Sequence, residues 1–167
     1  MGMFDLNNSC MEFKVHIMRN YWNKDNCLGN MMRLAYETFL VDTGLGGDVF
    51  CRNYQRLNQL AQESWFQHLW RLCDFLQVEL VLDKAYHVQP IREGDKCLMD
   101  AIIETGHFKG DDLVTVGIFR KFKAAHMVSC IVRCDGRKVR QDMLDNQKGL
   151  SRRQFPEEHP TTRMLEV

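Results

Sequence analysis

Residues 39–65, FLVDTGLGGDVFCRNYQRLNQLAQESW, decide the fold that the sequence predicts. An apolar run leads through a turn rich in Gly and Asp into a segment whose apolar residues recur every three or four positions. From Asn53 to Cys73 this spacing, uninterrupted by Pro or Gly, predicts one amphipathic helix of about twenty residues. The turn is therefore expected to join a strand to a long helix.

The rest of the chain predicts strands on both sides of this helix, because runs rich in β-branched and aromatic residues are bounded by turn residues. The expected strands are 12–22, 31–41, 75–90, 96–106, 113–122 and 126–134. One or two strands, a long helix and then consecutive strands at hairpin spacing indicate an α+β protein. Its antiparallel sheet would have one face covered by the helix.

Composition limits the possible classes. The chain has 167 residues, enough for one domain with a sizeable core, and its 22 basic and 22 acidic side chains give zero formal net charge. We therefore expect no binding to nucleic acid or to an anionic membrane surface. The seven cysteines are dispersed without a CxxC pair, which predicts reduced thiols in a cytoplasmic protein without a zinc site. No membrane span or signal peptide is expected from the sequence.

One short motif suggests a protease. Residues 40–44, LVDTG, resemble the active-site motif of retroviral-type aspartic proteases, in which two Asp carboxylates from paired subunits share a proton and activate water. In that family a further strand follows the turn, whereas a helix is expected here. The aspartic protease is therefore kept as an alternative.

A longer stretch suggests another family. Residues 42–57 resemble the strand–turn–helix segment of hotdog-fold thioesterases, closest to the 4-hydroxybenzoyl-CoA and enediyne polyketide types, and the similarity extends over 31–140. This resemblance implies a hotdog fold, an antiparallel sheet wrapped around one long central helix. The expected domains are an extension at 1–30, the hotdog domain at 31–142 and a polar extension at 143–167. The matching positions are Asp42, Thr43, Gly47, Val49, Tyr54, Arg56, Pro90, Gly94 and Asp95.

The resemblance implies a function as well. It predicts a thioesterase that releases an acyl or polyketide chain from acyl carrier protein or CoA, acting as a homodimer or homotetramer without a cofactor or metal. The alternative from another class is a non-catalytic hotdog protein that binds acyl groups or partner proteins. A dehydratase of the same fold is a third possibility, although it would need a His near the start of the helix.

Thioester hydrolysis needs a donor for the developing oxyanion and an activated water. The first amides of a helix lack intrahelical partners, and by resemblance the donor amide falls near Phe50 or Cys51. The position that holds a carboxylate in one branch of the family is occupied by Gly44. Asp48 is the nearest substitute; its carboxylate could orient water or cap the helix.

Three further residues are catalytic candidates. Glu63 lies on the expected helix, where another branch of the fold carries its carboxylate, and could also be a solvated residue. Arg56 matches an Arg that the enediyne type uses near the thioester, and could equally be a surface residue. Cys51 could act as a nucleophile if the helix start lowered its pKa, or be a small apolar residue.

The remaining candidates would bind substrate. Asp42 is expected to accept amide hydrogen bonds that stabilise the turn, and Tyr54 matches a family position. Trp65 could line a slot for the acyl chain or belong to the core. Lys121 and Lys123 could meet the phosphates of a phosphopantetheine arm or form an ordinary solvated edge.

Overall fold

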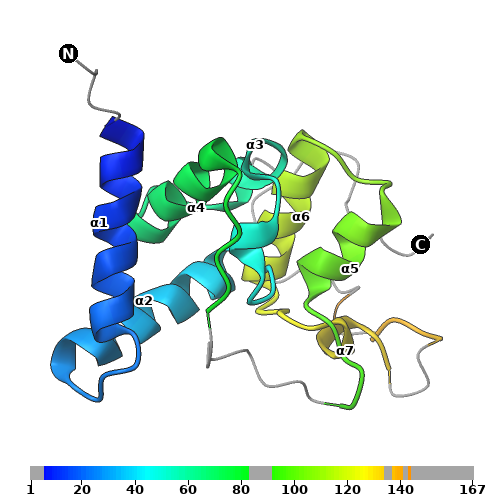
Figure 1. The fold of residues 1–167 in the computed structure, drawn as a ribbon. Coiled ribbons are helices and arrows are strands. Elements are labelled where there is room, and N and C mark those ends of the chain that lie inside the picture. Colours follow the sequence, from blue (N-terminus) through cyan, green and yellow to red (C-terminus); the bar gives the residue numbers. More distant parts are fainter. Residues whose placement is uncertain (1–5, 83–91, 134–136, 141–142, 144–167) are drawn as a thin grey trace. The chain divides into compact units, whose positions relative to one another are not determined.

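The computed structural model describes residues 6–82, 92–133, 137–140 and 143, and these residues are mainly helical. Seven α-helices and two short 3-10 helices follow one another within them (Figure 1), and the only strand-like pairings there are two isolated bridges. The predicted α+β class and the hotdog fold are therefore wrong, since the described residues form no sheet. The chain divides into two compact units, Met1–His87 and Val88–Val167.

The first unit begins with two helices where strands were predicted. Helix α1 spans Leu6–Tyr21 and helix α2 spans Cys27–Thr43. The Asn26 side chain caps α2 by accepting a hydrogen bond from the Gly29 amide at 2.8 Å. At the other end, Gly44 adopts the left-handed conformation, with φ of 74°, that ends many helices. These two caps define a helix despite the aromatic and β-branched residues between them.

The turn between α1 and α2 closes tightly on Gly29. A Cβ atom at this position would lie 2.2 Å from the Lys24 carbonyl oxygen and 2.5 Å from that of Tyr21. The Arg33 guanidinium also donates to backbone carbonyls of the turn, at 2.6 Å from the Trp22 oxygen. Only glycine allows the chain to approach α2 this closely.

The Gly- and Asp-rich turn follows a helix and not a strand. Asp42 and Thr43 form the last turn of α2, where the Thr43 hydroxyl donates to the Phe39 carbonyl at 3.0 Å. The Tyr36 hydroxyl donates to the Gly47 carbonyl at 2.8 Å and so fastens the turn to α2. The LVDTG sequence is thus a helix C-terminus, unlike the strand that leads into the turn of an aspartic protease.

The single long helix predicted for 53–73 is broken in two places. Helix η1 (Val49–Cys51) is followed by α3 (Tyr54–Leu57), η2 (Asn58–Leu60) and α4 (Trp65–Leu76). Asn53 caps α3 where the predicted helix also begins, whereas Ser64, inside the predicted helix, accepts a hydrogen bond from the amide three residues ahead and caps the new helix α4. The helical period was therefore identified correctly, but the continuity of the helix was wrong.

An aromatic cluster forms the core of the first unit, in which α4 packs against both α1 and α2 (Figure 1). The ring centroids of Tyr36 and Phe66 are 5.2 Å apart, and those of Phe39 and Trp70 are 6.2 Å apart. Such offset and edge-to-face contacts add to the free energy gained by burying the rings. Phe50 from η1 completes the cluster, and all five side chains are buried.

The second unit is also helical in its described part. Its helices are α5 (Leu98–Thr105), α6 (Asp111–Phe122) and α7 (Val128–Ile131). The strands predicted at 96–106, 113–122 and 126–134 are therefore wrong. Residues 83–90 of the strand predicted at 75–90 lie outside the described residues, while its first two residues end α4. Nowhere in the described ranges is a helix long and apolar enough to cross a membrane.

In the second unit, backbone hydrogen bonds join the short segment that precedes α5 to the short segment that precedes α7. The Leu98 amide donates to the His126 carbonyl at 2.9 Å, and the Val128 amide donates to the Lys96 carbonyl at 3.0 Å. This pairing places the starts of the two helices beside each other. The core below them is built from Leu98, Met99, Leu113, Val116, Phe119 and Met127.

Candidate functional site

Of the two amides predicted as oxyanion donors, that of Cys51 is already bonded in the structure. The Cys51 amide donates to the Asp48 carbonyl at 2.9 Å within η1, a helix of three residues. Phe50 is buried in the aromatic cluster. The Asp48 side chain makes no capping bond and pairs with Arg52 at 3.1 Å. The residues after the turn therefore form a compact, internally bonded 3-10 turn.

The environment of Cys51 is unsuited to a nucleophile. Burial raises the pKa of the Cys51 thiol, and the carboxylates of Glu79 and Asp48 raise it further against the opposing effect of Arg52. A raised pKa lowers the population of thiolate, which is the reactive form. The shift is opposite in direction to the one that nucleophilic catalysis needs.

Glu63 and Arg56 both lie at the surface. The Glu63 carboxylate is 3.6 Å from the His68 ring, and Arg56 lies in the last turn of α3 with an exposed side chain. Within the described part of the chain, no hydrogen bond or ion pair joins either residue to Asp48. The structure thus does not assemble these three candidates into a bonded constellation.

The predicted substrate-binding residues of the first unit make contacts within that unit. The Asp42 carboxylate accepts from the Gln62 amide at 3.1 Å, which ties the end of α2 to the segment before α4. Tyr54 packs edge-on against Trp70, with centroids 5.3 Å apart. The Trp65 ring lies 4.3 Å from the ammonium of Lys14, a cation–π distance.

The two candidate lysines belong to the second unit. Lys121 is exposed in the last turn of α6. The ammonium of Lys123, just after that helix, lies 5.8 Å from the Phe122 ring and 6.0 Å from the Phe119 ring. A cation there is favourable at a helix C-terminus whether or not it binds an anion.

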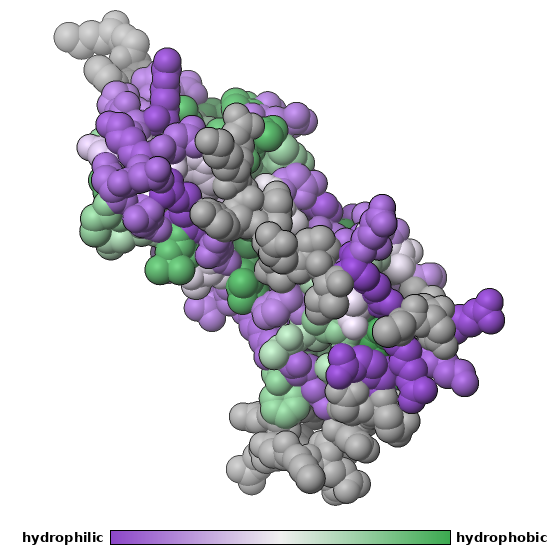
Figure 2. Space-filling view, turned by 90° about the horizontal axis from the view of Figure 1, so that it is seen from below, coloured by the Kyte–Doolittle hydropathy of each residue, from purple (hydrophilic) through white to green (hydrophobic). Residues whose placement is uncertain are grey.

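Helix α2 carries a second apolar face that sequence reasoning missed. Its exposed residues Met31, Leu34, Thr38 and Val41 recur at intervals of three, four and three, which places them on one side of the helix. Met31 is 61% exposed, Leu34 64% and Val41 40%. We call these four residues the α2 stripe. Seen from below, separate hydrophobic groups interrupt the mainly hydrophilic surface (Figure 2).

The charges beside the α2 stripe are acidic. Glu37 and Asp42 lie on α2 next to it, whereas the one basic residue of this helix, Arg33, points its guanidinium at the carbonyls of Trp22 and Lys24. Exposed apolar patches bordered by polar residues often mark interaction sites. The stripe is therefore the leading candidate surface of the first unit.

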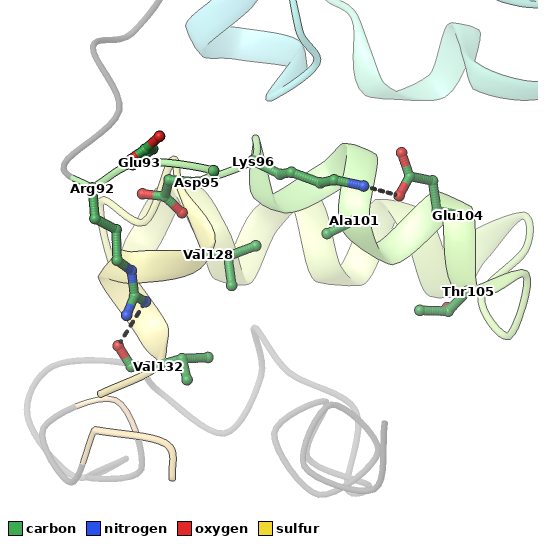
Figure 3. Close-up of a pocket in the computed structure, with 10 residues that line it drawn as sticks. Arg92, Glu93, Asp95, Lys96, Ala101, Glu104, Thr105, Val128 and Val132 are labelled. Carbon is green, nitrogen blue, oxygen red and sulfur yellow. Dashed lines mark hydrogen bonds and ion pairs between the residues drawn. The ribbon is translucent and has the colours of Figure 1, made fainter. Parts of the chain in front are cut away.

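The second unit contains a cavity of about 590 Å³ (Figure 3). Ala101 from α5, Val128 from α7 and Val132, which follows α7, line one part of it, and charged residues of the segment 92–96 line another. Lys96 pairs with Glu104 at 2.8 Å across its rim. Neither the predicted catalytic nor the predicted substrate-binding residues line this cavity.

A cysteine next to this cavity was also missed as a candidate. Cys97 immediately precedes α5 and pairs with Met127 in an isolated antiparallel bridge. The His126 Nδ1 lies 3.0 Å from the Arg120 guanidinium, and burial followed by the Arg120 charge lowers the pKa of the imidazole. The described contact of the His126 ring is therefore with Arg120.

Known proteins add no further guide to the site. No protein-family model matches the chain, and neither a curated protein nor a solved structure matches it. Function therefore has to be argued from the contacts, exposure and charges of these residues.

Proposed function

We propose that this protein is a non-catalytic binding module, and that its α2 stripe docks an amphipathic helix of a partner protein. The observation that carries this proposal is the two-sided character of α2. One side, with Phe39 and Leu40, is in the core, and the other exposes Met31, Leu34 and Val41 to solvent. A helix with two apolar sides is expected to have both covered when it functions.

The spacing of the stripe favours a helical partner. Residues at intervals of three, four and three occupy alternating a and d positions of a heptad, the pattern by which two helices pack side by side. From Met31 to Val41 the stripe runs about 15 Å at the helical rise per residue. This length matches about three turns of a partner helix.

The expected affinity is modest. Fully burying one large apolar side chain contributes roughly 1.5–3 kcal/mol, and these side chains are already partly covered, so completing their burial supplies on the order of 3 kcal/mol. Further contacts are needed to offset the entropy lost on association. Glu37 and Asp42 favour a partner that carries basic residues beside its apolar face. The modest gain from apolar burial, together with this charge complementarity, predicts reversible binding.

Hydrolysis of an acyl thioester stays a prediction from the sequence. The Cys51 amide proposed as oxyanion donor is bonded within η1, and the Cys51 thiol has a raised pKa. The sequence-based alternative was a non-catalytic hotdog protein that binds acyl groups or partner proteins. Its fold is wrong, but the exposure of the α2 stripe supports the binding of partner proteins.

Site-specific photocrosslinking tests the proposal in cells that express the full chain. A benzophenone amino acid replaces Leu34 in one variant and Phe13 in the matched control, because Phe13 is an equally exposed apolar residue on α1. We expect an adduct at position 34 that is absent at position 13, and the crosslinked segment should be an amphipathic helix. Leu34→Glu should then weaken binding of that recombinant segment about 30-fold, whereas Phe13→Glu should not.

Three results would refute the proposal. They are the absence of an adduct specific to position 34, an adduct only with another copy of this chain, and binding of the segment that Leu34→Glu leaves unchanged.

A further inference from the structure

The second unit holds a cavity that the proposed function does not use. Its volume of about 590 Å³ lies within the range of sites that hold small ligands, roughly 300–1,000 Å³. The cavity combines an apolar wall of Ala101, Val128 and Val132 with acidic and basic groups. An occupant should therefore have both an apolar and a charged part.

The basic groups of the cavity already have partners. The Lys96 ammonium pairs with the Glu104 carboxylate at 2.8 Å. The Arg92 guanidinium donates to the Arg133 carbonyl at 3.1 Å and to the Val132 carbonyl at 3.3 Å (Figure 3). Lys96 is thus paired with a carboxylate, and two N–H groups of Arg92 are bonded to backbone carbonyls, which leaves fewer donors for an anionic ligand.

One acidic group of the cavity has a carboxylate oxygen without a hydrogen-bond partner in the described part of the chain. Asp95 Oδ1 accepts from the Ser129 amide at 3.0 Å, whereas Asp95 Oδ2 is buried and has no hydrogen-bond partner among the described residues. Its carboxylate lies between Arg92 and Val128 (Figure 3), and Glu93 adds a second, exposed carboxylate. A buried oxygen without a donor costs free energy that a cationic donor would recover.

We propose that this cavity binds a lysine or arginine side chain of a peptide or protein ligand. The aliphatic stem would pack on Val128 and Val132, and the cationic head would meet the Asp95 carboxylate. Long basic side chains commonly bury their stems in this way while the charged head pairs with a carboxylate. This inference is independent of the α2 stripe, since it concerns the other unit.

Titration of the full chain with capped amino acids tests the inference. The probes are the Nα-acetyl methylamides of lysine and arginine, compared with those of norleucine, which keeps the lysine stem without its ammonium, and of glutamate. Binding is followed by the NMR methyl signals of Ala101, Val128 and Val132. We expect lysine or arginine to bind at least about tenfold more tightly than norleucine.

Asp95→Asn is the decisive variant, because the amide oxygen can still accept from the Ser129 amide while the charge is removed. It should weaken binding of the basic probes by about tenfold or more, and Glu104→Gln at the rim should change it by less than about threefold. If Asp95→Asn fails to fold, comparing the affinities of the basic probes and the norleucine probe for the unmodified chain still tests the inference. Equal binding of norleucine, preference for glutamate, an unaffected Asp95→Asn variant, or no methyl shift up to about 20 mM probe would overturn the inference.

Discussion

Gly29→Ala gives the most specific test of the first unit, because local and tertiary effects predict opposite signs. Gly29 lies in the first turn of α2. In an exposed helix, replacing Gly by Ala stabilises by about 1 kcal/mol. At Gly29, however, the added Cβ would meet the carbonyl oxygens of Lys24 and Tyr21 at 2.2 and 2.5 Å.

The cost follows from the movement that these contacts require. The Lys24 carbonyl would have to move from 2.2 Å to an ordinary contact distance of 3.4 Å, a displacement of about 1.2 Å. Both obstructing atoms belong to the backbone, so the whole turn must shift, and the hydrogen bond from the Gly29 amide to Asn26 is strained with it. Overpacking costs about 1–3 kcal/mol and a lost cap about 1 kcal/mol. After the helix-propensity gain, we expect a net destabilisation of about 2 kcal/mol.

Urea unfolding monitored by tryptophan fluorescence measures this effect. All three tryptophans of the chain lie in the first unit, so the signal reports on that unit. Thr38→Ala, at an exposed position of the same helix, is the matched control and should change the free energy of unfolding by less than about 0.5 kcal/mol. An unchanged or increased stability of Gly29→Ala would refute the tight α1–α2 turn.

Other predictions concern single groups. Tyr36→Phe removes the hydrogen bond to the Gly47 carbonyl and should lower the free energy of unfolding by about 1 kcal/mol in the same assay; no loss would contradict this fastening of the turn. The pKa of His126 is lowered from its ordinary 6.5, so its contribution to stability is present above that pH and is lost as the pH falls below it. His126→Gln should reduce the acid-side slope of stability against pH, and an unaltered slope would exclude this contribution. Burial raises the pKa of Cys73 to about 11, so mass spectrometry should find iodoacetamide labelling of Cys73 only after unfolding.

The helical period between 53 and 73 was the most informative signal in the sequence. It predicted the helical character of α3 and α4, because their apolar residues recur at intervals of three and four. The predicted single helix overlooked Ser64, whose side chain caps the new helix α4. Capping residues inside a periodic segment can therefore mark a break even without Pro or Gly.

The predicted strands failed because short apolar runs fit both periods. In α2, Tyr36, Phe39 and Leu40 follow helical spacing, and Asn26 and Gly44 are capping residues at its ends. The β-branched and aromatic content of the run favours a strand, whereas its spacing and its capping residues favour a helix. Propensity differs by only a few tenths of a kcal/mol per residue, so packing and caps override it.

The candidate surface could be predicted only in part. Spacing identifies residues that share a face of α2, such as Met31 and Leu34 on one side and Phe39 and Leu40 on the other. Both faces are apolar, so the sequence does not reveal which of them the core covers. That distinction comes from the packing of α4 and η1 against Phe39.

The central claim is that α2 has one buried and one exposed apolar face, and a matched pair of substitutions tests it most directly. Leu34 is 64% exposed and Leu40 is 5% exposed in the same helix. By urea unfolding, Leu34→Ala should change the free energy of unfolding by less than about 0.5 kcal/mol, whereas Leu40→Ala should lower it by roughly 2–5 kcal/mol. A loss at Leu34 as large as that at Leu40 would show that the stripe is already covered in the isolated protein, and the docking surface would be contradicted.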